Sequence, residues 1–324
     1  MTKMNSRVIG LIGIVSRMAN WNADFTGLPK TTSDGLIFGS DKALKYSIKQ
    51  WWDEQGKKVL YIRSYQLKTV TTGKEEEKGE KLQPRDLEER YQYLFQEGVS
   101  KNSTAVLKRL FECTDVMNFG ATFAVKGQNL GLTGAVQIGQ GFNKYADTNV
   151  EVQDILSPFR NSNAVSEDKD ATSLGKKRTV NEAHYVYPFT VNPKHYDGYV
   201  GLQGMDDFVG YTEEAYEDFR LGALMGATAL QTNSKSGAEN AFSLFVRFKE
   251  HELTYLPNLD PYVTVRRENG KIIYDLTSIA TMITDVQDQI EQIDLYLNPY
   301  SCEVLLKVPH LQRYSIINQS KLSE

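Results

Sequence analysis

Three lysines with helical spacing are the first candidates for binding chemistry in this sequence. Lys42, Lys45 and Lys49 lie in the run SDKALKYSIKQWWDEQG. On a helix, at 100° per residue, they share one narrow arc beside an apolar stripe. Ammonium groups spaced roughly 5–6 Å apart match a track for the phosphates of a nucleic acid. An ordinary solvated helix face would have the same pattern, so both interpretations stay open.

A second basic group lies in a long polar segment, residues 152–182, that has no clean hydrophobic periodicity. The group consists of Lys176, Lys177 and Arg178. An irregular segment of this length inside a compact domain is usually functional or disordered. Its apolar residues Phe159 and Leu174 either dock on the body of the protein or wedge between nucleic-acid bases.

Residues 118–145 read NFGATFAVKGQNLGLTGAVQIGQGFNKY, with six glycines and no acidic residue. Glycine at this density indicates a close approach of the backbone to another group. The stretch contains neither GxGxxG nor GxxxxGK[ST], and it does not lead directly into a helix. Dinucleotide and P-loop sites are therefore excluded. We predict strand, turn and strand, packed against a neighbouring strand or crossed by the backbone of a polymer.

Catalytic and metal-binding patterns are missing from the sequence. The four histidines are scattered without a metal-ligand spacing, and the two cysteines, Cys113 and Cys302, lie far apart. Asp24 and Asp34 follow the first apolar run, where a metal-dependent ribonuclease might keep a carboxylate. Turn formation explains both aspartates better. We therefore predict no catalytic residue, no metal and no cofactor.

Composition limits the class of protein. The chain has 324 residues, 40% of them hydrophobic, and a net charge of −4, which argues against indiscriminate coating of nucleic acid. Residues 205–219 hold six acids and no base, so a basic track and an acidic patch could join copies head to tail. Few cysteines and the lack of an apolar run of membrane-spanning length predict a cytoplasmic protein with no membrane partner.

The elements that would position these residues follow an α+β order. We expect strands at 7–15, 58–65, 184–191 and 241–248, with helices at 41–55, 84–98, 103–114, 212–232 and 278–292. A charged, solvated loop is expected at 71–83, and a hairpin that turns at Asn269–Gly270. Without its insertions the order is βαββαβ, the ferredoxin-like pattern. The chain is expected to form one elaborated domain, residues 1–324.

Three motifs together resemble one known family. They are GSDKALKYSIKQWW, FGATFAV…LTGAVQIGQGFNKY and GKKRTVNEAHYVYPFTVNP, in the family's order between about residues 8 and 248. The chain is similar to the backbone subunit of type I CRISPR Cascade complexes, in the RAMP superfamily, and most of all to its type I-B branch. Ala135 replaces the proline that often follows the TG pair, and NWNADFTGLP replaces a loop usually close to NPNGDP.

The resemblance implies an RRM-like palm with a helical finger insertion at 67–117 and a thumb loop at 152–182. Several copies would polymerise along one CRISPR RNA and present it for pairing with a target DNA strand, beside other Cascade subunits. In this family Lys45 and Lys49 match basic positions that contact the RNA backbone, with Lys42 nearby. Gly134, Val136 and Gln137 match the family's TGxVQ strand, which the resemblance places at the RNA.

Two alternatives remain beside this non-catalytic interpretation. One is an enzyme of the same superfamily, as in type III complexes, in which Asp24 or Asp34 would support metal-dependent cleavage of target RNA. The other is a protein-only interaction module on an RRM-like fold.

Overall fold

The longest strands of the chain belong to one central sheet. The computed structural model of the chain describes residues 2–72, 77–156 and 174–323. The strands of this sheet are β1 (Val8–Ala19), β2 (Phe38–Gly39), β7 (Val136–Ile138), β8 (Gly141–Asn143), β9 (Val150–Leu156), β10 (Leu174–Val191), β11 (Ala238–Phe248), β14 (Ile290–Leu297) and β16 (Leu311–Ser315). Their order is β16-β14-β11-β1-β10-β8-β2, and β7 and β9 also pair with β10.

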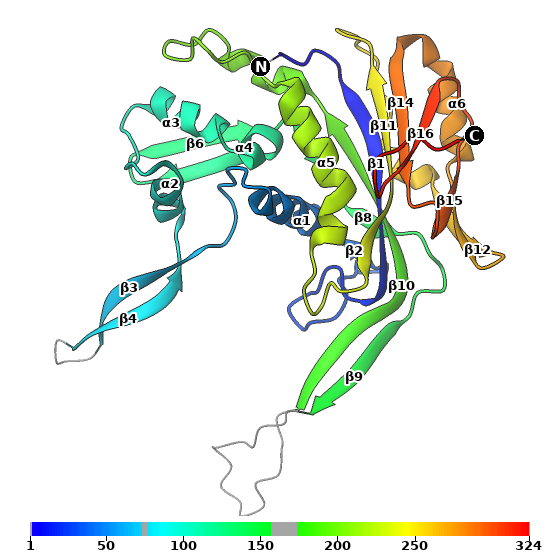
Figure 1. Cartoon of the computed structure of the whole chain (residues 1–324), viewed down its shortest axis with the longest axis horizontal. Coiled ribbons are helices and arrows are strands. Elements are labelled where there is room, and N and C mark those ends of the chain that lie inside the picture. Colours follow the sequence, from blue (N-terminus) through cyan, green and yellow to red (C-terminus); the bar gives the residue numbers. More distant parts are fainter. Residues whose placement is uncertain (1, 73–76, 157–173, 324) are drawn as a thin grey trace, which may run out of the picture.

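Strand β1 lies in the middle of the sheet, and both of its faces are covered. It pairs antiparallel with β10 on one side and with β11 on the other. Ile12 points into a core beneath helices α1 (Asp41–Glu54) and α5 (Glu213–Ala229), whereas Leu11 points into a second core on the other face (Figure 1). A strand buried on both faces has to be apolar at nearly every position, which explains the sequence VIGLIGIV.

Helices α1 and α5 pack closely because α5 presents glycines to α1. A Cβ on Gly222 would lie 2.6 Å from Ile48 Cγ2, and one on Gly226 would lie 3.0 Å from the Cα of Ile48. Helix α1 begins after Ser40, whose hydroxyl accepts a capping hydrogen bond, and ends before Gly56, which has a φ of 75°. Both glycines lie in the helix predicted at 212–232, and the surface that they approach closely is α1.

A smaller C-terminal layer closes the second core. It contains helix α6 (Thr277–Asp285) and the strands β12 (Thr264–Glu268), β13 (Lys271–Asp275) and β15 (Cys302–Leu305). These strands form a separate sheet in the order β12-β13-β15. The predicted hairpin is confirmed: Asn269 and Gly270 both have positive φ values, 49° and 82°, as a tight two-residue turn requires.

A long insertion between α1 and β7 has its own core. Its elements are β3 (Tyr65–Thr72), β4 (Glu77–Pro84), α2 (Leu87–Phe95), α3 (Ser103–Phe111), α4 (Thr114–Phe119), β5 (Gly120–Val125) and β6 (Gln128–Thr133). The core is built around Tyr91, Leu110 and Phe123, and it is separate from the two cores of the central sheet. β3 pairs with β4, and β5 with β6, in two-stranded sheets.

Three short 3-10 helices complete the described secondary structure. They are η1 (Pro193–Tyr199), η2 (Asp260–Tyr262) and η3 (Gln287–Gln289). Among the helices in the described ranges, none combines the length and the apolar composition needed to cross a bilayer.

The strand predicted at 58–65 is wrong. Asp115, at the start of α4, is buried, and its carboxylate accepts from the backbone N–H groups of Leu60 and Tyr61, both at 2.8 Å. These two donors are used by a side chain and cannot join a strand ladder. The place beside β10 is taken instead by β7 and β8, which come from the glycine-rich stretch.

Two predicted loops are also wrong. Much of the charged run at 71–83 lies in β4, which pairs antiparallel with β3. Residues 73–76 are outside the described part. In the segment at 152–182, β9 and the first part of β10 form a ribbon from Val150↔Val180 to Leu156↔Leu174. Most residues of these strands are polar, so their hydrophobic alternation is too weak to identify them as strands from the sequence.

The last predicted helix is too long. α6 ends at Asp285, and β14 begins at Ile290, inside the range that had been assigned to the helix. The mixed α+β class is confirmed. The ferredoxin-like palm with a finger and a thumb stays a prediction.

Glu182 in β10 connects the central sheet to the C-terminal layer. Its carboxylate accepts from Arg17 of β1 at 3.0 Å, from His184 Nε2 at 3.2 Å and from Arg267 of β12. The hydrogen bond from His184, followed by those from Arg267 and Arg17, lowers the pKa of Glu182 to about 2 in spite of its partial burial. His184 holds its other ring nitrogen 2.6 Å from the hydroxyl of Tyr274 in β13.

This network predicts a defined pH dependence of stability. A folded-state pKa below the ordinary value of 4.5 means that Glu182 stabilises the fold above pH 4.5, and that this contribution is lost as pH falls toward about 2. Glu182→Gln should therefore be less stable than wild type at pH 7, and the difference should shrink on acidification. Urea unfolding of both proteins at several pH values measures this, and a difference independent of pH would contradict it.

Candidate nucleic-acid interface

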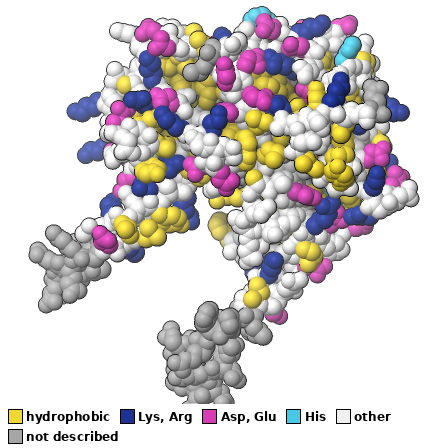
Figure 2. All heavy atoms as spheres, viewed as in Figure 1, with side chains coloured by type: hydrophobic (Ala, Val, Ile, Leu, Met, Phe, Trp, Pro, Cys, Tyr) yellow, Lys and Arg dark blue, Asp and Glu magenta, His cyan; other side chains and the backbone are white. Residues whose placement is uncertain are grey.

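The molecule is hollowed between two projecting ribbons. Figure 2 shows an open space between two arms. Figure 1 identifies the described parts of the arms as the β3–β4 hairpin and the β9–β10 ribbon. Helix α1 and strand β2 lie toward the inner end of the hollow (Figure 1).

The three lysines of α1 differ in exposure and in their bonding partners. Lys42 is exposed. Lys45 is half-buried, with its Nζ 3.2 Å from Asp41 Oδ2. Lys49 donates to the backbone carbonyl of Tyr61 at 2.8 Å, and burial lowers its pKa. Two of the three ammonium groups are therefore engaged with the protein itself, and RNA contact by Lys42, Lys45 and Lys49 stays a prediction.

Lys42 lines a small surface hollow that the sequence analysis missed. Lys30 and the rings of Phe38 and Phe142 lie in the same hollow. The Nζ of Lys30 is 5.6 Å from the centroid of the Phe38 ring, and the two phenylalanine rings are 6.1 Å apart between centroids. The hollow thus combines two lysines with two aromatic rings, groups that suit a phosphate and a sugar or base.

The carboxylate at the edge of this hollow already has partners. Asp41 accepts from Lys45 through one oxygen and from Gln140 through the other, each at 3.2 Å. Its negative charge is therefore partly balanced within the protein, which reduces its repulsion of an incoming phosphate.

No short-range signal in the sequence connects Lys30 and Phe142. They come together because Phe38 of β2 pairs with Phe142 of β8, a contact across more than a hundred residues. A usable hint was Phe38, two residues before the helix cap Ser40 in the run FGS. Its partner, Phe142, lies inside the glycine-rich stretch.

Four of the six glycines of that stretch, Gly120, Gly134, Gly139 and Gly141, are packed closely inside the protein. A Cβ on Gly134 would lie 2.2 Å from the carbonyl carbon of Phe119, and one on Gly139 would lie 2.8 Å from the ring of Pro188. A Cβ on Gly141 would lie 2.3 Å from the ring of Tyr187. At these positions the close approach is to the neighbouring chain segment.

The remaining two residues of the TGxVQ strand differ in accessibility. Val136 is completely buried, so its side chain cannot contact a ligand. Gln137 is exposed, and its side-chain amide donates to the carbonyl of Gly134 at 2.9 Å. His195 Nδ1 lies 2.9 Å from the same carbonyl and therefore carries the hydrogen. Gln137 alone of these three predicted residues offers a polar side chain to solvent.

The basic group at 176–178 lies on the β9–β10 ribbon. Lys176 is exposed and Lys177 is half-buried; they pair across the ribbon with Asp154 and Gln153. Arg178 has a structural contact, because its guanidinium donates to the carbonyl of Thr26 at 2.6 Å. This bond connects the base of the ribbon to the loop after β1.

The two candidates for a base wedge are only partly placed. The backbone of Leu174 pairs with that of Leu156 in the ribbon. Phe159 lies outside the described residues.

Asp24 and Asp34 form turns, as the sequence suggested. Asp24 Oδ1 accepts from the N–H groups of Thr26 and Leu28 at 2.8 and 3.0 Å, and Asp34 accepts from the hydroxyl of Thr32. The pKa of each aspartate is lowered mainly by a hydrogen bond from a threonine side chain, Thr26 for Asp24 and Thr32 for Asp34. Within residues 2–72, 77–156 and 174–323, no group of three or more His, Cys, Asp or Glu side chains is arranged to hold a metal ion.

Comparisons with known proteins give one matching family model and several solved structures of similar fold. The family model described as CRISPR-associated protein Cas7 matches residues 6–291, which is most of the chain. Two solved structures are similar in fold, each at 12% sequence identity. One is a "CRISPR RNA-guided surveillance complex, pre-nicking" (TM-score 0.55, covering 95% of this chain and 96% of that chain). The other is a "CRISPR RNA-guided surveillance complex" (TM-score 0.50, covering 92% and 91%). No curated protein matches the chain by sequence.

Two glycines of the same hairpin offer a matched test of the packing argument. Gly134→Ala should destabilise the fold by about 1–3 kcal/mol, because the added methyl group meets the backbone of residues 119–120. Gly131→Ala should change stability much less, because no atom lies within 4 Å of its Cβ position. Thermal and urea unfolding of both variants measure the effect, and equal stabilities would contradict it.

Proposed function

Because the chain belongs to the CRISPR-associated Cas7 family, we propose that it is a non-catalytic subunit that binds CRISPR RNA and polymerises along it. Its copies would form the backbone of a type I effector complex, together with other Cascade subunits. The guide held in this way would be presented to one strand of target DNA. We also propose that the complex belongs to the type I-B branch.

The observation that carries the proposal is the hollow at the N-terminal end of α1. It brings Lys30 and Lys42 together with the rings of Phe38 and Phe142. Lysines and stacking surfaces recognise the backbone and planar groups of any nucleotide, without reading base edges. A guide-binding subunit requires this, since base pairing supplies the sequence specificity.

The family's named parts correspond to observed elements in this proposal. The palm would be the central sheet with α1 and α5 on one face. The finger would lie within the insertion that carries β3, β4 and α2 to α4, and it would include the predicted range 67–117. The thumb would be the β9–β10 ribbon with residues 152–182, and Lys176 and Lys177 would contact the RNA backbone from that side. Gln137 would be a further polar contact.

Lys45 and Lys49 keep a role in this proposal that differs from the predicted one. Their ammonium groups are held by Asp41 and by the carbonyl of Tyr61. A surface ion pair contributes little, and the carbonyl of Tyr61 is a neutral acceptor, so phosphates of RNA that reaches the helix could exchange with both. In the free chain Lys45 pairs within α1, Lys49 connects α1 to Tyr61, and Lys42 is the exposed lysine of the three.

Charge reversal in the hollow should weaken RNA binding for all sequences alike. For Lys30→Glu with Lys42→Glu, we expect lower affinity for several unrelated single-stranded RNAs. The slope of log K against log salt should become shallower by roughly 1.4, since each lost phosphate contact on a single strand accounts for about 0.7. Fluorescence anisotropy titrations at four salt concentrations measure both quantities.

Lys249→Glu with Lys271→Glu makes the same charge change at two exposed lysines outside the hollow, and it serves as the control. Equal losses in both double variants would show that only net charge matters. Loss for one RNA sequence and not for others would contradict backbone recognition. Wild-type protein that binds no RNA would favour the protein-only interaction module.

The proposal also predicts that the assembled complex does not cleave target RNA. Asp24 and Asp34 use their carboxylates in turns, so adding Mg²⁺ should leave a labelled target RNA intact. A denaturing gel tests this. Cleavage that is abolished by Asp24→Ala or Asp34→Ala would establish the type III-like alternative.

A further inference from the structure

The β3–β4 hairpin has one apolar face that is open to solvent. Residues directly opposite each other in an antiparallel pair lie on the same face. Tyr65 pairs with Pro84, and Leu67 pairs with Leu82, so these four side chains share a face. Tyr65, Leu67 and Leu82 are 51%, 67% and 61% exposed, and Pro84 is also exposed. Figure 2 shows hydrophobic side chains gathered on this arm.

The other face of the hairpin is polar. There Gln66 pairs with Gln83, and Lys68 pairs with Lys81. The hairpin is thus amphipathic, yet in the part of the chain that the structure describes β3 and β4 pair only with each other. A two-stranded hairpin is marginally stable in water, and an exposed apolar patch marks an interaction site. Another surface should therefore cover this face.

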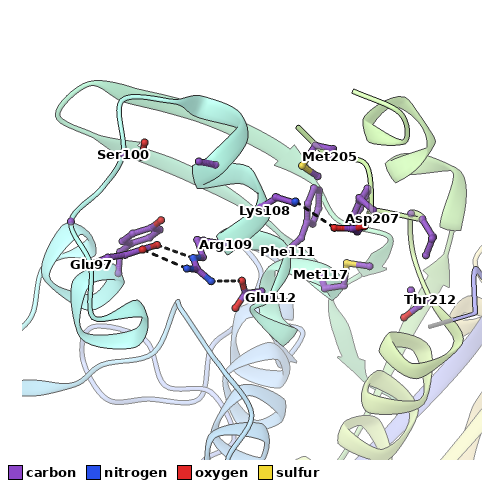
Figure 3. Close-up of a pocket in the computed structure, with 16 residues that line it drawn as sticks. Glu97, Ser100, Lys108, Arg109, Phe111, Glu112, Met117, Met205, Asp207 and Thr212 are labelled. Carbon is purple, nitrogen blue, oxygen red and sulfur yellow. Dashed lines mark hydrogen bonds and ion pairs between the residues drawn. The ribbon is translucent and has the colours of Figure 1, made fainter. Parts of the chain in front are cut away.

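An apolar cleft of matching character lies at the other side of the insertion. It has a volume of about 640 Å³ and runs between α3 and residues 205–212 (Figure 3). Its apolar lining includes Phe111, Met117, Met205 and Phe208, and the rings of Phe111 and Phe208 stack at 4.3 Å. A cleft of this size accommodates several apolar side chains.

The charged groups at the cleft neutralise one another. Lys108 lies 3.7 Å from Asp207, and Arg109 lies 2.8 Å from both Glu97 and Glu112, as the dashed lines in Figure 3 show. An ionic ligand would have to break these pairs. An apolar occupant leaves them in place and removes the hydrophobic lining from water.

The hairpin cannot reach the cleft of its own chain. Its base is fixed by a backbone hydrogen bond from Arg85 to Ser64 at 2.8 Å, and its Lys68 pairs with Glu89 of α2 at 2.8 Å. Figure 1 shows the hairpin running away from α3, which forms one wall of the cleft. The hairpin is therefore held out from the molecule, where it can meet the cleft only of another copy.

We propose that the apolar face of the β3–β4 hairpin of one copy docks into the cleft between α3 and residues 205–212 of the next copy. A projecting surface that fits a cavity elsewhere on the same molecule makes a head-to-tail contact, which builds open filaments. The inference rests on the proposed function, because a subunit that polymerises along RNA needs such a contact. It adds the two surfaces that make it.

Disulfide trapping tests the contact directly. Leu67→Cys and Ala105→Cys place one thiol on the hairpin face and one at the cleft, while the native Cys113 and Cys302 are buried. A mixture of the two single variants should give a covalent dimer under mild oxidation, and neither variant alone should give it. Lys68→Cys, on the polar face of the same strand, replaces Leu67→Cys in the control mixture and should trap at least tenfold less dimer.

Assembly on RNA provides the second measurement. Leu67→Thr with Leu82→Thr, which adds no charge, should weaken the addition of a second copy to a long RNA at least tenfold, measured by mass photometry. Ala105→Trp, which fills the cleft, should have the same effect. Binding of one copy to a short RNA should stay unchanged. Thermal unfolding is used to check that these surface variants are folded.

The outcomes separate this inference from the proposed function. If neither the wild type nor the variants bind RNA but the mixed disulfide forms, the contact stands and the RNA-binding proposal fails. If the leucine variants assemble on RNA like wild type, or the mixture traps no more dimer than its control, the contact is wrong and RNA binding stands. A hairpin face that proves to bind a different protein would likewise overturn it.

Discussion

The burial of β1 on both faces is the constraint on which the rest of this structure depends. One face is covered by α1 and α5, and the other by α6 and the small C-terminal sheet. The contact of Gly222 and Gly226 with α1 then fixes that helix over the sheet. As a result, the N-terminal end of α1 and the β2–β8 pair form one rigid surface. The arms extend from this body, and they carry little of the core.

The sequence predicted well the parts that are buried in a regular pattern. Residues 7–15 read as a strand covered on both faces, and Ser40 and Gly56 bracket a helix, because each pattern reports a local physical requirement. It failed where a distant side chain replaced a backbone partner. The Asp115 carboxylate accepts hydrogen bonds from the N–H groups of Leu60 and Tyr61, and no local sequence pattern predicts these bonds.

The candidate site was predicted in part for the same reason. The lysine at position 42 and the glycine-rich stretch were identified from local sequence. The hollow beside Lys42 was not, because Lys30 and Phe142 meet only through the pairing of β2 with β8. The inward orientation of Lys45 and Lys49 also depends on partners, Asp41 and Tyr61, of which only the first is close in sequence.

A division of labour follows for the proposed subunit. The glycines serve packing, the two turn-forming aspartates shape the loop after β1, and exposed lysines and aromatic rings are left for the RNA. The most direct test of this account is to purify the chain from cells that express a CRISPR array and to size and sequence the RNA that accompanies it. We predict one discrete guide class with a shared repeat-derived tag, bound by several copies of the chain. Absence of RNA, or a random mixture of cellular fragments, would contradict the account.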